Sequence, residues 1–239
     1  MRYLISAFVL ILFCARALSD NLAYEAEYQA EYKGGWIPIK VSASRKLEKL
    51  ESGQWRSAFA VYSSIMDLSE TSLMNLGDKG FVPNTYEFKT TGFATKERRK
   101  QIFKWDERKV WGDHKSKYWK YLLIDGTQDS MSYQEQLRLD LINNKEVLSY
   151  PVVYKHKLKT YEFERVGLKE VKTPKGMVKA IEIKQKLNKY NKLESRSWFA
   201  VDYDYVLLKL KQKRPDGTEQ VISLKRAKVN GKELVAFEK

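Results

Sequence analysis

Histidines and neighbouring carboxylates are the first residues whose types suggest chemistry. The 239-residue chain has two histidines, His114 and His156, and both lie among lysines. Asp113 precedes His114, and consecutive side chains on a strand point to opposite faces. A structural zinc site usually needs three or four Cys, His or carboxylate ligands at ordered spacing, which this pattern does not offer. We therefore interpret His114 as a solvated loop histidine and expect no metal and no cofactor.

Nucleophiles and paired acids give weak signals as well. Serines are numerous, but the chain has no GxSxG motif and its glycines form no phosphate-binding loop. Asp202 and Asp204 in "VDYDY" are two residues apart, so on a strand they share a face and form a carboxylate pair or a calcium site. We favour the other interpretation, a polar outer face, and we predict that the protein is not an enzyme.

Aromatic and basic residues are more informative. The chain has 6 Trp, 15 Tyr and 10 Phe, and its formal net charge is +14. Large apolar side chains on a curved sheet either fill a core or enclose a cavity for an acyl chain or another apolar ligand. Lysine and arginine gather in four segments, 96–100, 109–121, 155–159 and 211–217, and in 109–121 they are mixed with Trp and Tyr.

Nearly all of the chain alternates as β-strands do. In "AYEAEYQAEYK" at 23–33, Ala and Tyr occupy every second position and polar residues lie between them. Similar runs follow up to about residue 122 and again from 147 to 229, separated by turn residues such as "GDKG" at 77–80. This pattern predicts a mainly β fold, a curved open antiparallel barrel or half-barrel rather than an α/β fold. No linker is evident, so we expect a single domain over 20–239.

One segment, "DSMSYQEQLRLDLI" at 129–142, has helical spacing instead. Asp129 or Ser130 can accept hydrogen bonds from the first free amides, and Tyr133, Leu137 and Leu141 recur every four residues as one apolar stripe. Gln134, Glu135 and Arg138 are then expected to face water, and Asn143-Asn144 to end the helix. We predict one main amphipathic helix that plugs the concave side of the half-barrel.

The first residues indicate export. Arg2 precedes an apolar run from Leu4 to Cys14, and the small residues of "ARALS" follow it. Such a run is too short to span a bilayer and is typical of a cleavable signal peptide. We predict a signal peptide at 1–19, with cleavage after Ser19 or, alternatively, Ala17, and a location in the periplasm. Export argues against a nucleic-acid partner. Two explanations of the positive charge remain: lysines that keep the sheet edges soluble, or attraction to an anionic membrane surface.

Five segments together resemble the DUF3108 family of exported bacterial proteins, in the family's order: 67–88, 103–106, 125–141, 160–176 and 198–217. The resemblance implies a periplasmic β-rich fold, similar in outline to the half-barrels of the lipoprotein carriers LolA and LolB. The family's function is not established, so the resemblance assigns no site residues.

Two functions remain as expectations. The preferred one is the binding of a lipid or other apolar ligand under the helix, in maintenance of the cell envelope. The alternative is a scaffold or interaction protein of the envelope with a filled core, whose protein partner the sequence does not name. The predicted ligand-binding residues are Trp55, Phe59, Trp105, Tyr133, Leu137, Leu141 and Trp198.

Overall fold

The computed structural model describes residues 22–33, 39–63, 66–92, 96–114, 117–173, 176–188 and 192–235. The predicted signal peptide at 1–19 lies outside these residues, as do parts of the expected turns at 34–35, 174–176 and 188–191. Among the described residues, no helix is both long enough and apolar enough to cross a membrane.

Strands dominate the described chain, and their alternation follows the sequence pattern. In β1, Tyr24, Ala26, Tyr28 and Ala30 are buried, whereas the glutamates between Tyr24 and Tyr28 are exposed. The strands are β1 (Tyr24–Lys33), β2 (Ile39–Lys49), β3 (Trp55–Tyr62), β4 (Met66–Gly77), β5 (Gly80–Gly92), β6 (Glu97–Lys104), β7 (Lys109–His114), β8 (Lys117–Leu122), β9 (Leu148–Tyr154), β10 (Lys157–Thr173), β11 (Gly176–Gln185), β12 (Glu194–Ala200), β13 (Val206–Lys213), β14 (Glu219–Val229) and β15 (Lys232–Val235).

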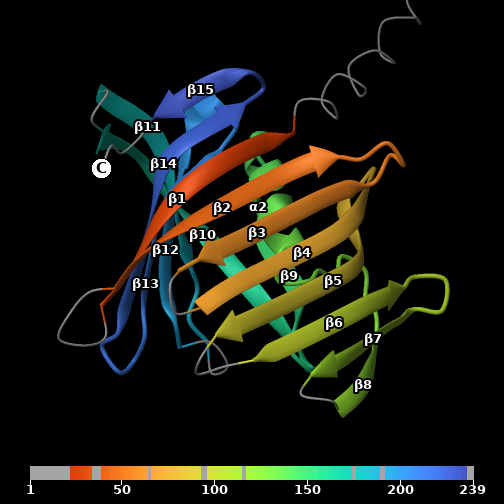
Figure 1. The fold of residues 1–239 in the computed structure, drawn as a ribbon. Coiled ribbons are helices and arrows are strands. Elements are labelled where there is room, and N and C mark those ends of the chain that lie inside the picture. The colour runs from red at the N-terminus through yellow and green to blue at the C-terminus, as the bar shows by residue number, and fades with distance from the viewer. Residues whose placement is uncertain are drawn as a thin grey trace, which may run out of the picture.

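These strands form one antiparallel sheet that is not closed into a barrel. Its order is β8-β7-β6-β5-β4-β3-β2-β1-β14-β13-β12-β11-β10-β9, and β15 pairs with β14. The sheet therefore consists of two meanders, β1–β8 and β9–β14, that pair with each other through β1 and β14. The prediction of a curved, open antiparallel half-barrel with one main helix on its concave side is confirmed (Figure 1).

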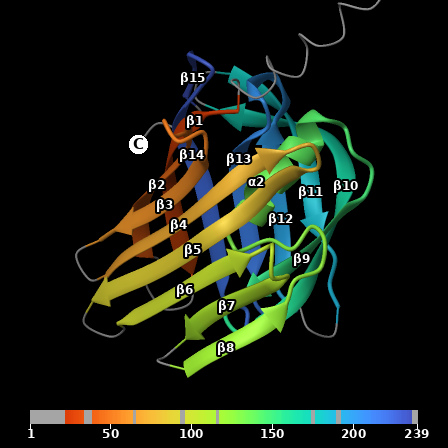
Figure 2. The same cartoon turned by 90° about the vertical axis from the view of Figure 1, so that its right-hand side faces the viewer.

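The helix α2 (Ser132–Ile142) belongs to the connection between β8 and β9, the two outermost strands of the sheet. Because this connection runs from one edge of the sheet to the other, it has to cross the opening of the half-barrel. Figure 2 shows α2 between the two meanders. Just before the helix, Gln128 forms a parallel bridge with Val152 of β9, and its carbonyl accepts the Val153 amide at 2.9 Å. The topology thus explains why the helix plugs the concave side.

The strand expected through "VDYDY" is interrupted. A 3-10 helix, η1 (Val201–Tyr203), separates β12 from β13, and Asp204 adopts a left-handed conformation with φ 47°. Asp202 and Asp204 therefore do not lie two apart on one face of a strand, as the alternation suggested. The bend redirects the chain, and the Asp204 carbonyl contacts the helix instead.

Candidate functional site

Helix α2 is the centre of the concave side, and it is attached to both meanders. Leu137 and Leu141 pack in a buried apolar cluster with residues of β9, β11 and β12. These residues are Leu148, Tyr150, Val152, Ile183 and Phe199. On the side of the first meander, the contacts of the helix are mainly polar.

Glu135 forms the main polar attachment. Its side chain is about 1% exposed, and its carboxylate accepts from Arg45 Nη2 at 2.8 Å, Ser57 Oγ at 2.7 Å and the Tyr24 hydroxyl at 3.2 Å. The three donors come from β2, β3 and β1, which are adjacent in the sheet. We call Glu135, Arg45, Ser57 and Tyr24 the helix lock. An ion pair this deeply buried adds little net stability over apolar packing, but it fixes the position of the helix because either charge alone is costly.

The start of the helix is capped by a second buried acid. Asp129 Oδ1 accepts the amides of Met131 at 2.7 Å and Ser132 at 2.8 Å, and Oδ2 accepts from Ser72 Oγ at 2.6 Å. This confirms Asp129 as the acceptor for the first free amides. Burial raises the pKa of Asp129 to about 6, although the hydrogen bonds from Ser72, Ser132 and Met131 act in the opposite direction.

A chain of hydrogen bonds crosses the helix from one meander to the other. The Phe81 amide of β5 donates to Gln136 Oε1 at 2.7 Å, and Gln136 Nε2 donates to Asp140 Oδ1 at 2.8 Å. The Tyr150 hydroxyl of β9 donates to Asp140 Oδ2 at 2.8 Å. Movement of α2 away from the sheet would break contacts to β5 and β9 together.

Arg138 attaches the last part of the helix. Its guanidinium donates to the carbonyls of Leu22 and Asp204, both at 2.7 Å, and lies 4.7 Å from the centroid of the Tyr24 ring. The expectation that Gln134, Glu135 and Arg138 face water is wrong: Glu135 and Arg138 are buried and Gln134 is half-buried. The helical spacing identified the apolar stripe, but the strands on the other side of the helix bury its polar residues too.

One sequence signal pointed to this polar network. Arg45 occupies an inward position of β2, between Ala43 and Leu47, where the alternation calls for an apolar residue. A charged residue at such a position predicts a buried partner of opposite charge, because an unpaired buried charge is costly. The position of the partner, 90 residues later in Glu135, follows only from the tertiary structure.

The residues predicted to bind a ligand belong to three apolar clusters. Tyr133, Leu137 and Leu141 share one cluster, and Trp55, Phe59 and Trp198 take part in a second. Trp105 packs in a third, with Phe103 stacked at 6.4 Å, and donates its indole N–H to the Pro83 carbonyl at 2.8 Å. The structure thus does not gather all seven along one surface, and their role in ligand binding stays a prediction.

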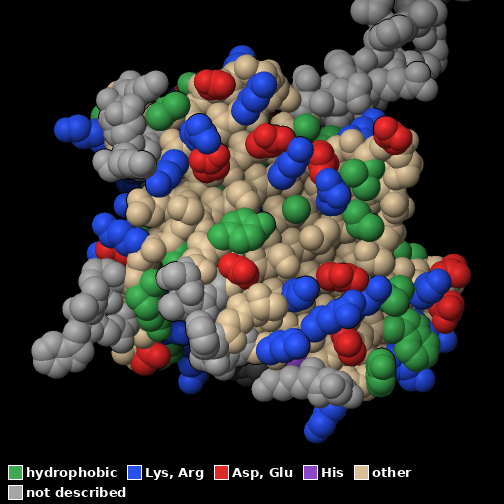
Figure 3. All heavy atoms as spheres, viewed as in Figure 1, with side chains coloured by type: hydrophobic (Ala, Val, Ile, Leu, Met, Phe, Trp, Pro, Cys, Tyr) green, Lys and Arg blue, Asp and Glu red, His purple; other side chains and the backbone are tan. Residues whose placement is uncertain are grey.

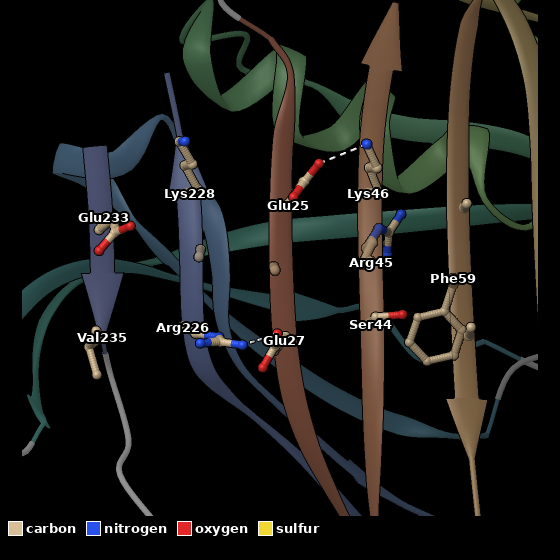
Figure 4. Close-up of a pocket in the computed structure, with 14 residues that line it drawn as sticks. Glu25, Glu27, Ser44, Arg45, Lys46, Phe59, Arg226, Lys228, Glu233 and Val235 are labelled. Carbon is tan, nitrogen blue, oxygen red and sulfur yellow. Dashed lines mark hydrogen bonds and ion pairs between the residues drawn. The ribbon is translucent and has the colours of Figure 1, made fainter. Parts of the chain in front are cut away.

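A hollow of about 600 Å³ lies on the outer face of the sheet, across β15, β14, β1, β2 and β3 (Figure 4). We call it the outer groove. Small side chains form part of its lining, namely Ser44, Ala58 and Ala60. Four of the charges of its rim form pairs, Lys46 with Glu25 at 2.7 Å and Arg226 with Glu27 at 2.6 Å, and Lys228 and Glu233 add one charge of each sign. A groove with internally neutralised charges has no strong preference for a charged ligand.

The histidines lie differently from our expectation. His114 is the last residue of β7, not part of a solvated loop, and its ring stacks on that of His156 with centroids 5.6 Å apart. His114 Nδ1 is 3.3 Å from Glu97 Oε1, and burial lowers the pKa of His114. Within the described part of the chain, no three His, Cys, Asp or Glu residues form a group that could hold a metal ion.

Comparison with solved structures gives matches that cover most of the chain at low sequence identity. A β-barrel-like protein of the domain of unknown function DUF1849 from Brucella abortus has a TM-score of 0.58 and 11% identity, and the match covers 87% of this chain and 97% of that one. A DUF1329 family protein from Desulfovibrio piger has a TM-score of 0.35 and 10% identity, with coverage of 90% and 88%. A putative outer membrane lipoprotein-sorting protein domain from Vibrio parahaemolyticus has a TM-score of 0.24 and 9% identity, with coverage of 87% and 85%. The first of these likenesses shows a shared fold and no more.

No curated protein matches the chain. The family model described as "Protein of unknown function (DUF3108)" matches residues 27–225, which is most of the chain and includes most of β1 and of β14 and three of the four residues of the helix lock, Arg45, Ser57 and Glu135. The expected resemblance is confirmed, and the chain belongs to the DUF3108 family.

Proposed function

We propose that the protein is a non-enzymatic protein of the cell envelope that acts through its outer surface, with an interior that stays filled. The observation that carries this proposal is the attachment of α2 to both meanders. Its buried polar residues contact β1, β2, β3, β5 and β9, and its leucines pack in an apolar cluster. Location in the periplasm is part of the proposal and rests on the signal peptide expected at 1–19.

A filled interior suits a scaffold better than a carrier. A carrier has to release its plug at a modest free-energy cost, because access to the cavity depends on this movement. Replacing α2 by an apolar ligand would leave the Arg45 guanidinium in an apolar space without its carboxylate, which alone costs several kcal/mol. The helix therefore acts as a structural closure of the open barrel rather than as a gate.

Lipid binding under the helix is the second candidate, and one observation supports it. Tyr133 contacts the rings of Tyr161 at 5.3 Å and Phe163 at 6.2 Å, and Leu137 packs near Phe199. If α2 moved out, Tyr161, Phe163 and Phe199 would line an apolar space on the sheet. Each Å² of apolar surface buried by a ligand there would contribute roughly 25 cal/mol.

Lipid analysis of the native protein separates the two candidates. The protein is purified from the envelope without denaturant, extracted, and measured by lipid mass spectrometry, while hydrogen exchange follows the amides of 132–142. A filled interior predicts no stoichiometric lipid and helix amides that exchange as slowly as those of the buried strands. A stoichiometric lipid that is lost in Leu137→Arg and kept in Leu168→Arg, a matched change at an exposed leucine, would establish the carrier instead.

A further inference from the structure

Two basic segments that are distant in the sequence meet at one end of the molecule. The Tyr121 hydroxyl of β8 donates to the carbonyl of His156, in the turn between β9 and β10, and His156 stacks on His114 of β7. Figure 2 shows β7, β8 and the near end of β9 together. This brings Lys109, Lys117 and Lys120 into the same region as Lys155, Lys157 and Lys159. We call this region the basic end.

Lys109 of the basic end lies 3.7 Å from Glu107, but four other exposed lysines in or next to this region lack acidic partners. These are Lys117, Lys120 and Lys157, together with Lys104 of β6, which pairs across the sheet with Lys109 of β7. None of the four makes an ion pair with any other residue that the structure describes. By contrast, Lys46 and Arg226 at the outer groove each have a glutamate within 3 Å. These four ammonium groups are therefore free to attract an anionic surface.

Exposed apolar side chains lie between these lysines. Tyr118 is 90% exposed, Leu122 73% and Trp111 42%. Cross-strand pairing places Trp111 opposite Lys120, whose ammonium is 5.5 Å from the indole ring, and Leu122 opposite Lys109. Figure 3 shows hydrophobic and basic side chains interleaved over β6, β7 and β8. Apolar surface this exposed usually marks an interaction site.

We propose that the basic end docks on the surface of a membrane that contains anionic phospholipid. This inference rests on the proposed function, because it identifies the outer surface through which the protein acts. Tyr and Trp favour the boundary between head groups and acyl chains, and lysine stems keep their ammonium groups at the phosphates. Each basic residue near an anionic surface contributes enough to change binding several-fold.

A membrane fits these observations better than an extended peptide does. β8 is an end strand of the sheet, so a peptide could pair with its free edge. Such pairing would use the backbone of β8 and one row of its side chains. The unpaired lysines, however, come from β6, β8 and the start of β10, and their spread over three elements suits a broad anionic plane.

Vesicle flotation tests the proposal with the protein as purified from the envelope. The probes are vesicles of phosphatidylcholine alone and of phosphatidylcholine with about 30% phosphatidylglycerol, a content chosen to give a clear negative surface charge. We expect binding to the second kind only, weakened by salt. Lys120→Glu/Lys157→Glu and Tyr118→Ser/Leu122→Ser should each reduce binding at least about tenfold.

The far end of β10 offers matched controls. Leu168 and Met177 are 57% and 56% exposed, and Lys172 and Lys179 are exposed beside them. Lys172→Glu/Lys179→Glu makes the same charge reversal there, and Leu168→Ser/Met177→Ser likewise replaces two exposed apolar side chains by serine. Both should leave vesicle binding within about twofold. Circular dichroism verifies the fold of every variant.

Three outcomes would overturn the inference: no binding to anionic vesicles, equal binding to both kinds of vesicle, or equal losses in the control variants. If an added peptide that pairs with the free edge of β8 displaced the protein from anionic vesicles while the lysine variants still bound them, β8 would be a site for a protein partner instead. Failure of the proposed function looks different. It would appear as stoichiometric lipid in the purified protein, whatever the vesicles show.

Discussion

Arg45 and Glu135 illustrate how individual buried charges set the position of an element. Each is buried, and each is satisfied by groups from other elements, with Arg45 Nη1 also donating to Gln134 Oε1 at 2.6 Å. The strength of this arrangement lies in the penalty for separating its members rather than in a net gain over apolar packing. These two buried residues therefore fix the position of α2.

Removal of one partner should be much more damaging than removal of both. Glu135→Leu leaves the Arg45 guanidinium buried without its carboxylate, and we expect the free energy of unfolding to fall by about 3–5 kcal/mol. The double variant Arg45→Met/Glu135→Leu should recover more than about 1 kcal/mol of this loss. Urea unfolding of the original protein, the single variant and the double variant measures these free energies.

The exposed pair Arg56–Glu48 supplies the control. Glu48→Leu there should cost less than about 1 kcal/mol, because solvent screens the pair. Equal costs at Glu135 and Glu48 would show that the helix lock contributes no more than a surface pair.

The raised pKa of Asp129 predicts how the free energy of unfolding changes with pH. Its pKa in the folded protein is about 6, above the ordinary value of 3.8, so the folded state binds this proton more tightly than the unfolded state does. The stabilisation is fully present below the unfolded pKa and is lost as pH rises through about 6. From pH 7 to pH 5, this group alone should add about 1 kcal/mol of stability.

Asp129→Asn keeps an oxygen for the amides of Met131 and Ser132 but removes the titration. Urea unfolding at pH 7 and pH 5 should therefore show a smaller gain on acidification in the variant than in the original protein. Parallel pH profiles for the two proteins would rule out Asp129 as the source.

At the scale of elements, the two-residue turn between β4 and β5 supports the helix. Gly77 pairs with Gly80, and Gly80 has φ +111°, a conformation that side chains disfavour. A Cβ on Gly80 would lie 2.2 Å from Gln136 Oε1, the acceptor of the Phe81 amide. The hairpin thus approaches α2 so closely that glycine is required.

Gly80→Ala should destabilise the protein by about 2 kcal/mol more than Gly53→Ala. Both positions have positive φ, but a Cβ on Gly53 meets no atom within 4 Å, so only the first change displaces Gln136. Thermal unfolding compares the two variants. If both lose the same stability, backbone strain alone accounts for the glycine and the contact with Gln136 is unimportant.

At the scale of the whole molecule, the pairing of β1 with β14 joins the meanders late in the sequence. Arg226 of β14 bonds Glu27 of β1 across 199 residues. Contacts between such distant residues carry a large entropic cost of closure before they contribute stability. The two meanders can each form from local hairpins, whereas their joining has to wait for the last strands.

Slow folding should follow from this topology. We expect refolding to take milliseconds to seconds or longer. Because α2 contacts both meanders, tryptophan fluorescence and far-ultraviolet circular dichroism should report a single unfolding transition. Stopped-flow mixing checks the rate. An early unfolding step of the helix alone would contradict the role of the helix lock.

The sequence by itself determined the period-two strands, the position of the helix and its apolar stripe at Tyr133, Leu137 and Leu141. These features depend on local spacing, and local spacing is visible in one chain. It also narrowed the acceptor of the first free amides to Asp129 or Ser130, because such an acceptor lies within one turn of these amides, and the structure shows that it is Asp129.

Only the tertiary structure decided the rest. The burial of Glu135 and Arg138, the partners of Arg45, and the break at Asp202 and Asp204 all depend on strands that pair across long stretches of chain. The meeting of the two basic segments at His156 depends on the return of β9 beside β8 across the open barrel. Periodicity specifies which face of an element is apolar, but the surface that covers the opposite face is set by topology.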